Sequence, residues 1–408
     1  MSSVKKIILE NGLTILLKKV KNTKKACIMI NINVGSINEK ENEYGISHFT
    51  EHLAFKSNKY RSAKEISKDL EYKGTITNAF TSYENTVFFG KCFKENCKDT
   101  LQILFEAITN LNYKKEEVEL ERQVILTEIQ NYIELPDKQI LLLFLKDLYK
   151  GSHYGHPIEG YKNIAEKITI NNLEEFKKEN YVPNNMIICI TGNFNQKEVI
   201  SSIKNTFGIL KRKELEKIST IQPINNKKEN THKRKELNQS FLALGVIVPN
   251  AQDKESTTIE LLSTYVGEGM SSKMFEKLRE EKGIGYSVGC GYYNLGKTAC
   301  IVAYVVGFDK KQEIEAKNII VDILKQLKNK EISDEELKGI KNYYLSRYVD
   351  EFDKVEFHAL ELLNKEIYNI PYDYTKKDIL IKKITKKDML TTSKKIFSDN
   401  LTISLLKS

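Results

Sequence analysis

Two histidines and a glutamate lie within five positions of one another in the segment GISHFTEHLAF, residues 45–55. His48 and His52 are four residues apart, so on an α-helix both imidazoles project from one face and can hold one metal ion. Glu51 lies between them and can stand beside that ion without binding it. A catalytic zinc ion takes three protein ligands and leaves the fourth position to water, so a third ligand must come from elsewhere. The alternative is that both histidines lie on a helix surface or in a polar core.

A second predicted helix, EEVELERQVILTEIQNYIEL, supplies candidates for the third ligand. Glu121, Ile125 and Glu128 recur in it at spacings of four and three and form one stripe. Burying two carboxylates in an otherwise apolar stripe is unfavourable unless a cation meets them. We therefore predict Glu128 as the third zinc ligand and Glu121 as a carboxylate that supports the site from behind. The alternative is that both glutamates face solvent.

The bulk composition is that of an ordinary globular protein. The chain has 408 residues, of which 40% are hydrophobic and 29% charged, which predicts two or more domains. No run of eighteen apolar residues occurs, so no membrane span is expected. The N-terminal stretch is interrupted at Glu10-Asn11-Gly12, and no small-residue cleavage site follows. We expect two short strands about an Asn-Gly turn instead of a signal peptide, and a cytoplasmic protein.

Cysteine usage and net charge exclude other classes of function. The six cysteines are scattered without a C-x-x-C pair, which predicts core residues instead of a disulfide framework or a zinc finger. The net charge of +9 comes from lysines spread over the whole chain. It permits an anionic partner, but the basic residues form no stripe interleaved with aromatic residues. Nucleic-acid binding is therefore not expected.

The sequence contains one structural pattern twice. Residues 68–80 resemble residues 276–288, each with a helix end, a Lys-Gly pair and a strand. The flanking patterns also match, in the order strand, helix, helix, strand, strand, helix, helix. This predicts an α+β fold of two homologous halves, each a mostly antiparallel sheet with helices packed on one face. We place the halves at 1–212 and 236–408, joined by a charged linker at 213–235.

The two halves differ at the histidine motif. The second half has Ile-Glu-Leu-Leu at residues 259–262, so the metal chemistry is expected in the first half only. His153 and His156 lie in a loop rich in glycine and proline, without a nearby run of carboxylates. His232 and His358 are isolated. None of these four histidines is expected to bind a metal.

Residues 48–52 spell H-x-x-E-H, the inverted zinc motif. Together with Glu128, they resemble the M16 family of metallopeptidases, the inverzincins. That family also has a glutamate seven residues before its third ligand, a position that Glu121 matches here. The resemblance covers nearly the whole chain and agrees with the internal repeat. It implies two α/β-sandwich halves, one zinc ion per chain and a zinc-dependent endopeptidase in which Glu51 is the general base.

The resemblance also implies a substrate site. Four residues would form an edge strand whose main chain pairs with an extended peptide: Asn78, Ala79, Phe80 and Thr81. Arg279 and Tyr286, seven residues apart in the second half, would bind the substrate carbonyl and the oxyanion that forms on it. The alternatives are an ordinary polar-ended strand, a surface arginine and a strand aromatic.

The resemblance further implies a chamber closed by two clam-shell halves, of which a chain of this size supplies only one. A homodimer is therefore expected, with a heterodimer of homologous chains as a second possibility. A closed chamber would admit unfolded peptides or flexible termini and exclude folded domains. The alternative function is that of a non-catalytic partner subunit in a heterodimeric peptidase of this kind. That reading would require a broken motif, whereas all three ligands and the base are present here.

Overall fold

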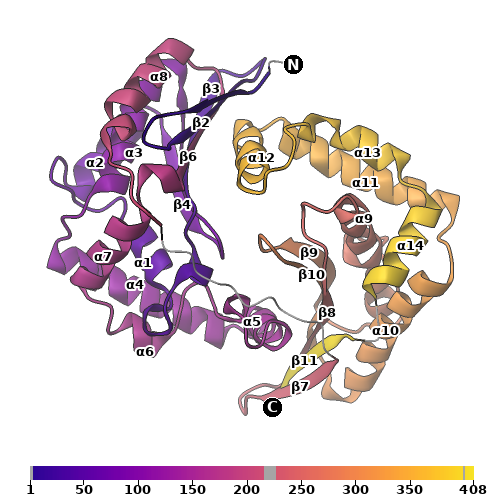
Figure 1. The fold of residues 1–408 in the computed structure, drawn as a ribbon. Helices are drawn as coiled ribbons and strands as arrows, with labels where there is room; N and C mark the ends of the chain where they lie inside the picture. The colour runs from indigo at the N-terminus through magenta and orange to yellow at the C-terminus, as the bar shows by residue number, and fades with distance from the viewer. Residues whose placement is uncertain (1–2, 216–226, 398–399) are drawn as a thin grey trace. The chain divides into compact units, whose positions relative to one another are not determined.

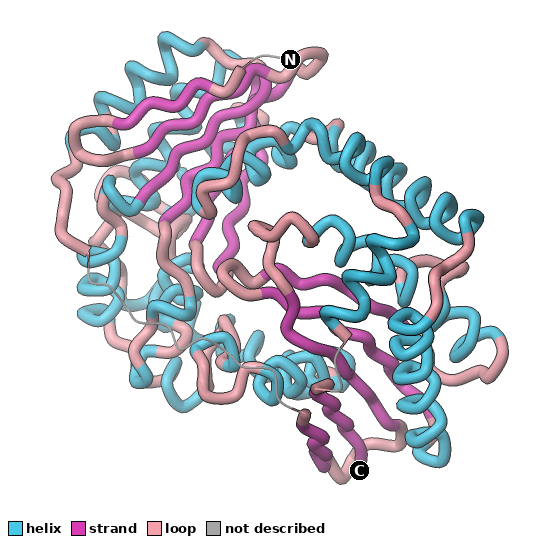
Figure 2. Tube along the Cα trace, turned by 45° about the vertical axis from the view of Figure 1, so that its right-hand side comes forward, coloured by secondary structure: helices cyan, strands magenta, loops and turns pink. Residues whose placement is uncertain are grey.

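The computed structural model of the protein contains two compact units, each assembled from separate stretches of the chain (Figures 1 and 2). The residues that the structure describes are 3–215, 227–397 and 400–408. The first unit comprises Met1–Gln130, Pro157–Ser219 and Asp350–Tyr372. The second unit comprises Asn131–His156, Thr220–Val349 and Asp373–Ser408. Each unit has its own sheet and its own hydrophobic core.

The first unit is built on a six-stranded sheet in the order β1-β2-β6-β3-β5-β4. Its strands are β1 (Lys5–Ile8), β2 (Thr14–Lys19), β3 (Lys25–Ile32), β4 (Ile76–Thr81), β5 (Thr86–Phe93) and β6 (Met186–Gly192). Only the pair of β2 and β6 is parallel, and the other four pairs are antiparallel. The predicted Asn-Gly turn between β1 and β2 is confirmed, because Gly12 adopts a φ of 88° there, a conformation that favours glycine.

The second unit repeats this arrangement in a five-stranded sheet, ordered β7-β11-β8-β10-β9. Its strands are β7 (Lys228–Lys233), β8 (Ser240–Val248), β9 (Ser287–Asn294), β10 (Ala299–Phe308) and β11 (Thr402–Lys407). Again one pair, β7 with β11, is parallel and the others are antiparallel. Read in the order of the sheet, β7, β11, β8, β10 and β9 take the places of β2, β6, β3, β5 and β4 in the first sheet. The predicted α+β fold of two similar halves with mostly antiparallel sheets is therefore confirmed.

The helices of both units follow the predicted order around these strands. The first unit has α1 (Ile46–His52), α2 (Ala63–Tyr72), α3 (Cys97–Thr109), α6 (Lys162–Ala165), α7 (Ile170–Asn180) and α8 (Gln196–Asn205). It also has α4 (Lys115–Glu134) as far as Gln130, where the second unit begins. The second unit has α9 (Ser256–Gly267), the π-helix η7 (Phe275–Glu280), α10 (Glu313–Asn329), α11 (Asp334–Phe352), α13 (Lys377–Lys383) and α14 (Lys386–Ile396). On one face of the first sheet, Ile28, Ile30 and Phe88 are fully buried in the core beneath the helices. Burial of such side chains is the main favourable contribution to the free energy of folding.

The opposite face of each sheet is covered by one more helix, which comes from the other half of the sequence. Helix α12 (Val355–Ile367) packs on β3 and β6, where the Thr191 hydroxyl donates a hydrogen bond to the Val355 carbonyl at 2.7 Å. Helix α5 (Pro136–Leu148) packs on β8 and β11, where Asp147 accepts a hydrogen bond from the Ser404 hydroxyl at 2.6 Å. Each compact unit thus contains one helix from the opposite half of the sequence. Strand β7 lies inside the segment 213–235, which was predicted as a linker. The boundaries 1–212 and 236–408 stay a prediction.

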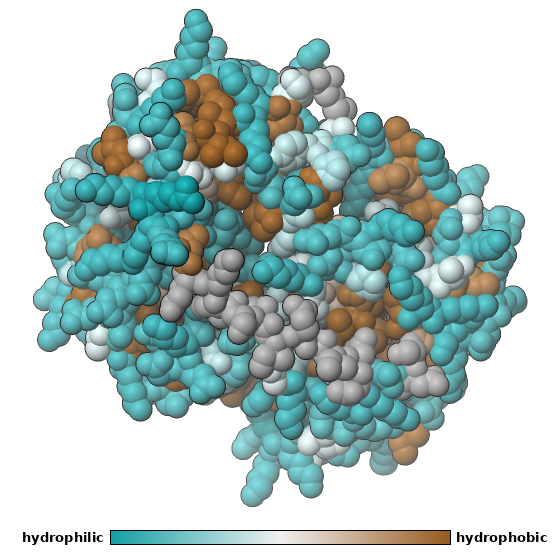
Figure 3. Space-filling model, in the orientation of Figure 1, coloured by the Kyte–Doolittle hydropathy of each residue, from teal (hydrophilic) through white to brown (hydrophobic). Residues whose placement is uncertain are grey.

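Polar and charged side chains dominate the molecular face drawn in Figure 3, where hydrophobic side chains gather in separate patches. All six cysteines are buried, as the sequence predicted for core residues. Among the helices of the described residues, none combines the length and the apolar character that a membrane span needs.

Candidate metal centre

Helix α1 carries both histidines, and its N-terminus is fixed by a glycine and a buried carboxylate. Gly45 has a φ of 98°, and a Cβ atom there would lie 2.6 Å from a backbone oxygen, so glycine is required. The Glu39 carboxylate accepts hydrogen bonds from the backbone N–H groups of Gly45 at 2.7 Å and Ser47 at 2.8 Å. Burial raises the pKa of Glu39 to about 8, against these two hydrogen bonds. These contacts hold the first turn of α1, from which His48 projects.

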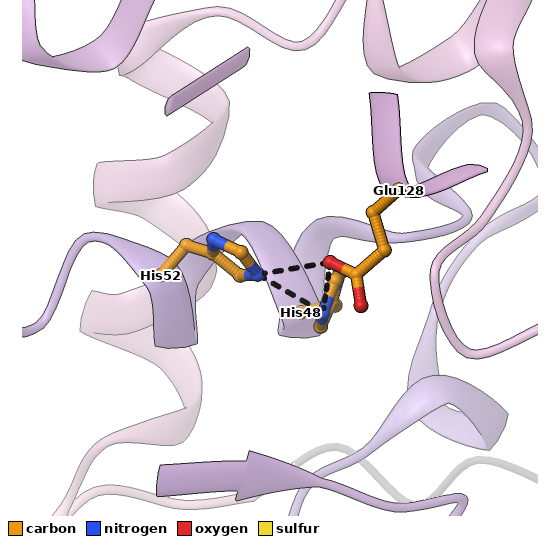
Figure 4. A group of neighbouring side chains, drawn as sticks. All are labelled: His48, His52 and Glu128. Carbon is orange, nitrogen blue, oxygen red and sulfur yellow. Dashed lines mark hydrogen bonds and ion pairs between the residues drawn. The ribbon is translucent and has the colours of Figure 1, made fainter. Parts of the chain in front are cut away.

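Helix α4 brings Glu128 to the two histidines (Figure 4). The Nε2 atoms of His48 and His52 are 3.1 Å apart. Oε2 of Glu128 lies 3.7 Å from His48 Nε2 and 3.5 Å from His52 Nε2. Within the described residues, this is the only group of three or more His, Cys, Asp or Glu side chains that could hold a metal ion, with ligand atoms within 4.8 Å of one another. Two imidazole nitrogens and one carboxylate oxygen are a donor set of catalytic zinc sites, so the group fits a zinc ion.

The two histidines have different proton affinities. Burial and, to a smaller extent, the charge of the neighbouring His52 lower the pKa of His48 to about 4, against the charge of Glu128. His48 therefore stays in the neutral form that binds metals. Burial also lowers the pKa of His52, but hydrogen bonds with Glu128 and Glu121 and the charge of Glu51 outweigh burial, so the pKa is raised overall. A proton therefore competes with a metal ion mainly at His52.

Glu51 lies on α1 beside the three candidate ligands and is not a member of their group. Its Oε2 atom accepts a hydrogen bond from the Thr81 hydroxyl at 3.3 Å. Burial raises the pKa of Glu51, against the charge of His52 and the hydrogen bond from Thr81. A carboxylate with a raised pKa next to a metal position is suited to accept a proton and return it.

Glu121 lies behind His52, on the side away from Glu128. The residue is only 7% exposed, and its Oε2 atom is 3.1 Å from Nδ1 of His52. This contact fixes the imidazole ring so that Nε2 points at the other candidate ligands. The second oxygen of Glu121 lies 2.5 Å from the ammonium group of Lys56. Sequence reasoning did not single out Lys56, whose only signal is its position four residues after His52.

Strand β4, which contains the four residues of the proposed substrate strand, is the last strand of its sheet. It pairs on one side with β5, through partners such as Asn78 with Phe89 and Phe80 with Val87. Asn78 and Phe80 are exposed, whereas Ala79 and Thr81 on the other face are half-buried. Within the described residues no strand pairs with the outer edge of β4, so its backbone offers a place for another strand.

Arg279 and Tyr286 lie close together in the second unit, whereas the candidate ligands belong to the first. Arg279 lies in the π-helix η7, and its Nη1 atom donates a hydrogen bond to the Gly285 carbonyl at 2.7 Å. Single π-helical turns occur often at functional sites. The Tyr286 residue is 80% exposed, and its backbone N–H donates to the Val306 carbonyl at 2.8 Å. The Arg279 guanidinium is thus bound to the residue before Tyr286, and the Tyr286 side chain extends from a hydrogen-bonded backbone.

An ion pair occupies the corresponding place in the second unit. Glu260, at the point that matches the histidine motif, lies 2.7 Å from the ammonium group of Lys377 and accepts a hydrogen bond from the Tyr344 hydroxyl. A lysine thus supplies the positive charge there. That metal chemistry belongs to the first half only stays a prediction.

The remaining histidines take part in other contacts. His232 Nε2 lies 2.7 Å from Oδ2 of Asp147, and the His358 ring packs edge-on against Phe352 with ring centres 4.8 Å apart. His153 begins the 3₁₀ helix η4 (His153–Gly155), and His156 follows it. None of them belongs to a candidate metal group within the described part of the chain.

Comparisons with known proteins identify the family to which this chain is similar. The model of the family "Insulinase (Peptidase family M16)" matches residues 14–162, and the model of "Peptidase M16 inactive domain" matches residues 167–344. An "Uncharacterized zinc protease" of Rickettsia felis is 30% identical over 401 residues, which cover 98% of this chain and 96% of that protein. The "Uncharacterized zinc protease YmxG" of Bacillus subtilis is 27% identical over 338 residues, covering 83% and 82%.

Solved structures show the same fold. A protease from Helicobacter pylori has a TM-score of 0.91 at 24% identity, with both chains covered completely. A structure from Pseudomonas fluorescens, described as a peptidase M16 inactive domain, has a TM-score of 0.90 at 15% identity and covers 100% of this chain and 98% of its own.

Proposed function

Because this chain belongs to peptidase family M16, we propose that it is a zinc-dependent endopeptidase that cleaves unfolded peptides or flexible termini. The observation that carries this proposal is the convergence of His48, His52 and Glu128, whose ligand atoms lie within 4.8 Å of one another. A carboxylate that can act as a base, Glu51, lies on the same helix as both histidines. All four side chains come from the first unit, so the proposed ligands and base form one local site.

In this proposal His48, His52 and Glu128 hold one zinc ion, which supplies Lewis acidity and lowers the pKa of its water toward ~7. Glu51 accepts the proton of the attacking water and then donates it to the departing amine. The Thr81 hydroxyl, 3.3 Å from Oε2 of Glu51, holds the base in place. Glu121 does the same for the His52 ring through Nδ1.

The substrate is proposed to add to the outer edge of β4 as an extended strand, through the backbone of residues 78–81. Main-chain pairing of this kind gives affinity with little dependence on side chains. The guanidinium of Arg279 and the phenol of Tyr286 are proposed to stabilise the oxyanion, within one chain or across a dimer. The proposed assembly is a homodimer, or a heterodimer with a homologous chain, that encloses the peptide.

The zinc-loaded protein should cut unstructured peptides and leave folded domains intact, because only an extended chain can pair with β4. A digest of a library of unstructured peptides, read by mass spectrometry, tests this expectation. A folded domain with a flexible tail serves as the control and should lose only its tail. If the zinc-loaded protein cut none of the peptides, the alternative of a non-catalytic partner subunit would replace this proposal.

Tyr286→Phe should lower kcat by roughly 10²-fold while KM and zinc content change little. The substitution removes one hydroxyl from an exposed side chain, so folding should be unaffected. The proposed hydrogen bond forms only in the transition state, which is why kcat carries the loss. Tyr293→Phe, on strand β9 of the same unit, is the matched control and should behave as the wild type. If both variants had the same kcat, Tyr286 would have no part in the chemistry.

A further inference from the structure

Two consecutive residues in the loop after α1 bind two glutamates of α4. The Lys56 ammonium lies 2.5 Å from Oε1 of Glu121. Ser57 donates two hydrogen bonds to the Glu117 carboxylate, from its backbone N–H at 3.1 Å and from its hydroxyl at 2.5 Å. Glu117 and Glu121 are one helical turn apart, so both contacts lie on one face of α4. We call these contacts the Lys56–Ser57 clamp.

The clamp joins the two helices that carry the candidate ligands. Helix α1 ends at His52, and Lys56 follows four residues later, with its backbone N–H donating to the Leu53 carbonyl at 3.2 Å. Helix α4 continues from Glu121 to Glu128, two turns further on. The loop that leaves the histidines is therefore bound directly to the helix that presents the carboxylate ligand.

Ser57 is held from several sides. It is only 4% exposed, and its carbonyl accepts a hydrogen bond from the Asn110 amide at 3.2 Å. Its hydroxyl also accepts a hydrogen bond from the backbone N–H of Ala63 at 3.1 Å. A buried serine with these partners has little freedom to move, so it fixes the distance between the loop and α4 at Glu117.

The ammonium group of Lys56 balances the negative charge of the nearly buried Glu121 carboxylate. One oxygen of Glu121 faces His52, and the other faces Lys56. An exposed ion pair contributes little, but a buried carboxylate that loses its cation is strongly destabilised. Without Lys56, a turn of the Glu121 carboxylate toward water would lower its free energy. This movement would release the His52 ring from its orientation.

We propose that the Lys56–Ser57 clamp pre-organises the zinc ligands by fixing α1 against α4 and by holding Glu121 against His52. Lys56 and Ser57 are positioning residues, and this inference rests on the proposed zinc function. Three side chains from two helices have to converge on one ion. Holding them in place beforehand removes an ordering cost from metal binding, as partners behind metal ligands generally do.

The test measures the zinc affinity of the full-length protein by competition with a chromogenic chelator. Lys56→Met should bind zinc roughly 10-fold more weakly or worse, the range found when partners of metal ligands are removed. Lys56→Arg retains the charge and should recover most of the affinity. Lys59→Met is the matched control, because it removes one positive charge from the same loop, where the ammonium lies over the Tyr60 ring at 4.6 Å. This control should bind zinc as the wild type does.

Cobalt(II) gives a second reading, since its d–d absorption depends on the arrangement of its ligands. Lys56→Met should change these bands, and Lys59→Met should not. Thermal unfolding of the metal-free variants checks that each is folded. If Lys56→Met does not fold, Ser57→Ala takes its place, and this variant is also expected to bind zinc more weakly. Wild-type zinc affinity in the folded clamp variants would overturn the inference. If the wild type itself bound no zinc, the proposed function would be wrong. The inference about the clamp, which rests on that function, would then be withdrawn as well.

Discussion

Glu51→Gln is expected to bind zinc as tightly as the wild type and to cleave peptide roughly 10²–10⁴-fold more slowly, the usual loss for a general base. The Glu51 carboxylate lies outside the group of three ligand atoms, so the metal should stay. Glutamine has the same shape and can keep the contact with Thr81, but its amide cannot take up a proton at working pH. Zinc content, kcat and the Kd for an uncleaved peptide together separate binding from chemistry.

The matched control for this prediction is Glu71→Gln, which makes the same change at an exposed position of α2 and should leave all three quantities unchanged. Turnover by Glu51→Gln within tenfold of the wild type would remove Glu51 from its proposed role. A variant that binds peptide without cutting it would also retain natural substrates, which mass spectrometry could then identify.

Local rules of sequence explain the fold that was confirmed and also the candidate ligands, which stay a prediction. The order of strands and helices follows from hydrophobic periodicity, and the similarity of residues 68–80 to 276–288 predicted the repeat. A spacing of four placed His48 and His52 on one face of a helix. Glu128 was predicted as the third ligand because it lies in an apolar stripe, where an unpaired carboxylate would be unfavourable. Each of these inferences needs only a short stretch of chain.

Other features depend on the path of the chain through space. Strand β7 has the sequence KENTHK, without an apolar residue, and it is a strand because its backbone pairs with β11. Nothing in the composition of α5 or α12 indicates which sheet each covers, because the two helices follow the same pattern in the two halves. The contacts of Glu39 and Lys56 cannot be predicted from the sequence either, because their partners come close only once α1 and α4 are in place.

His48→Ala, His52→Ala and Glu128→Gln are each expected to lose both the zinc ion and peptide cleavage. Only three protein ligands are proposed, and a catalytic site leaves the fourth position to water, so the loss of one ligand leaves two. Metal analysis should find one zinc ion per chain in the wild type and little in these variants. A chelator should abolish wild-type cleavage, and added zinc should restore it. His232→Gln, which changes a histidine paired with Asp147 in the second unit, is the matched control and should retain zinc.

Comparison of Glu128→Gln with Glu121→Gln distinguishes a ligand from a residue that supports one. Oε2 of Glu128 lies within 3.7 Å of both Nε2 atoms, whereas Glu121 contacts His52 only through Nδ1, on the other side of the ring. Glu128→Gln should therefore lose zinc outright, and Glu121→Gln should bind it roughly 10–100-fold more weakly. If Glu128→Gln kept full zinc and full activity, the third ligand would be a different group. A reversed order of the two losses would name Glu121 as that ligand and would require the His52 ring to turn over.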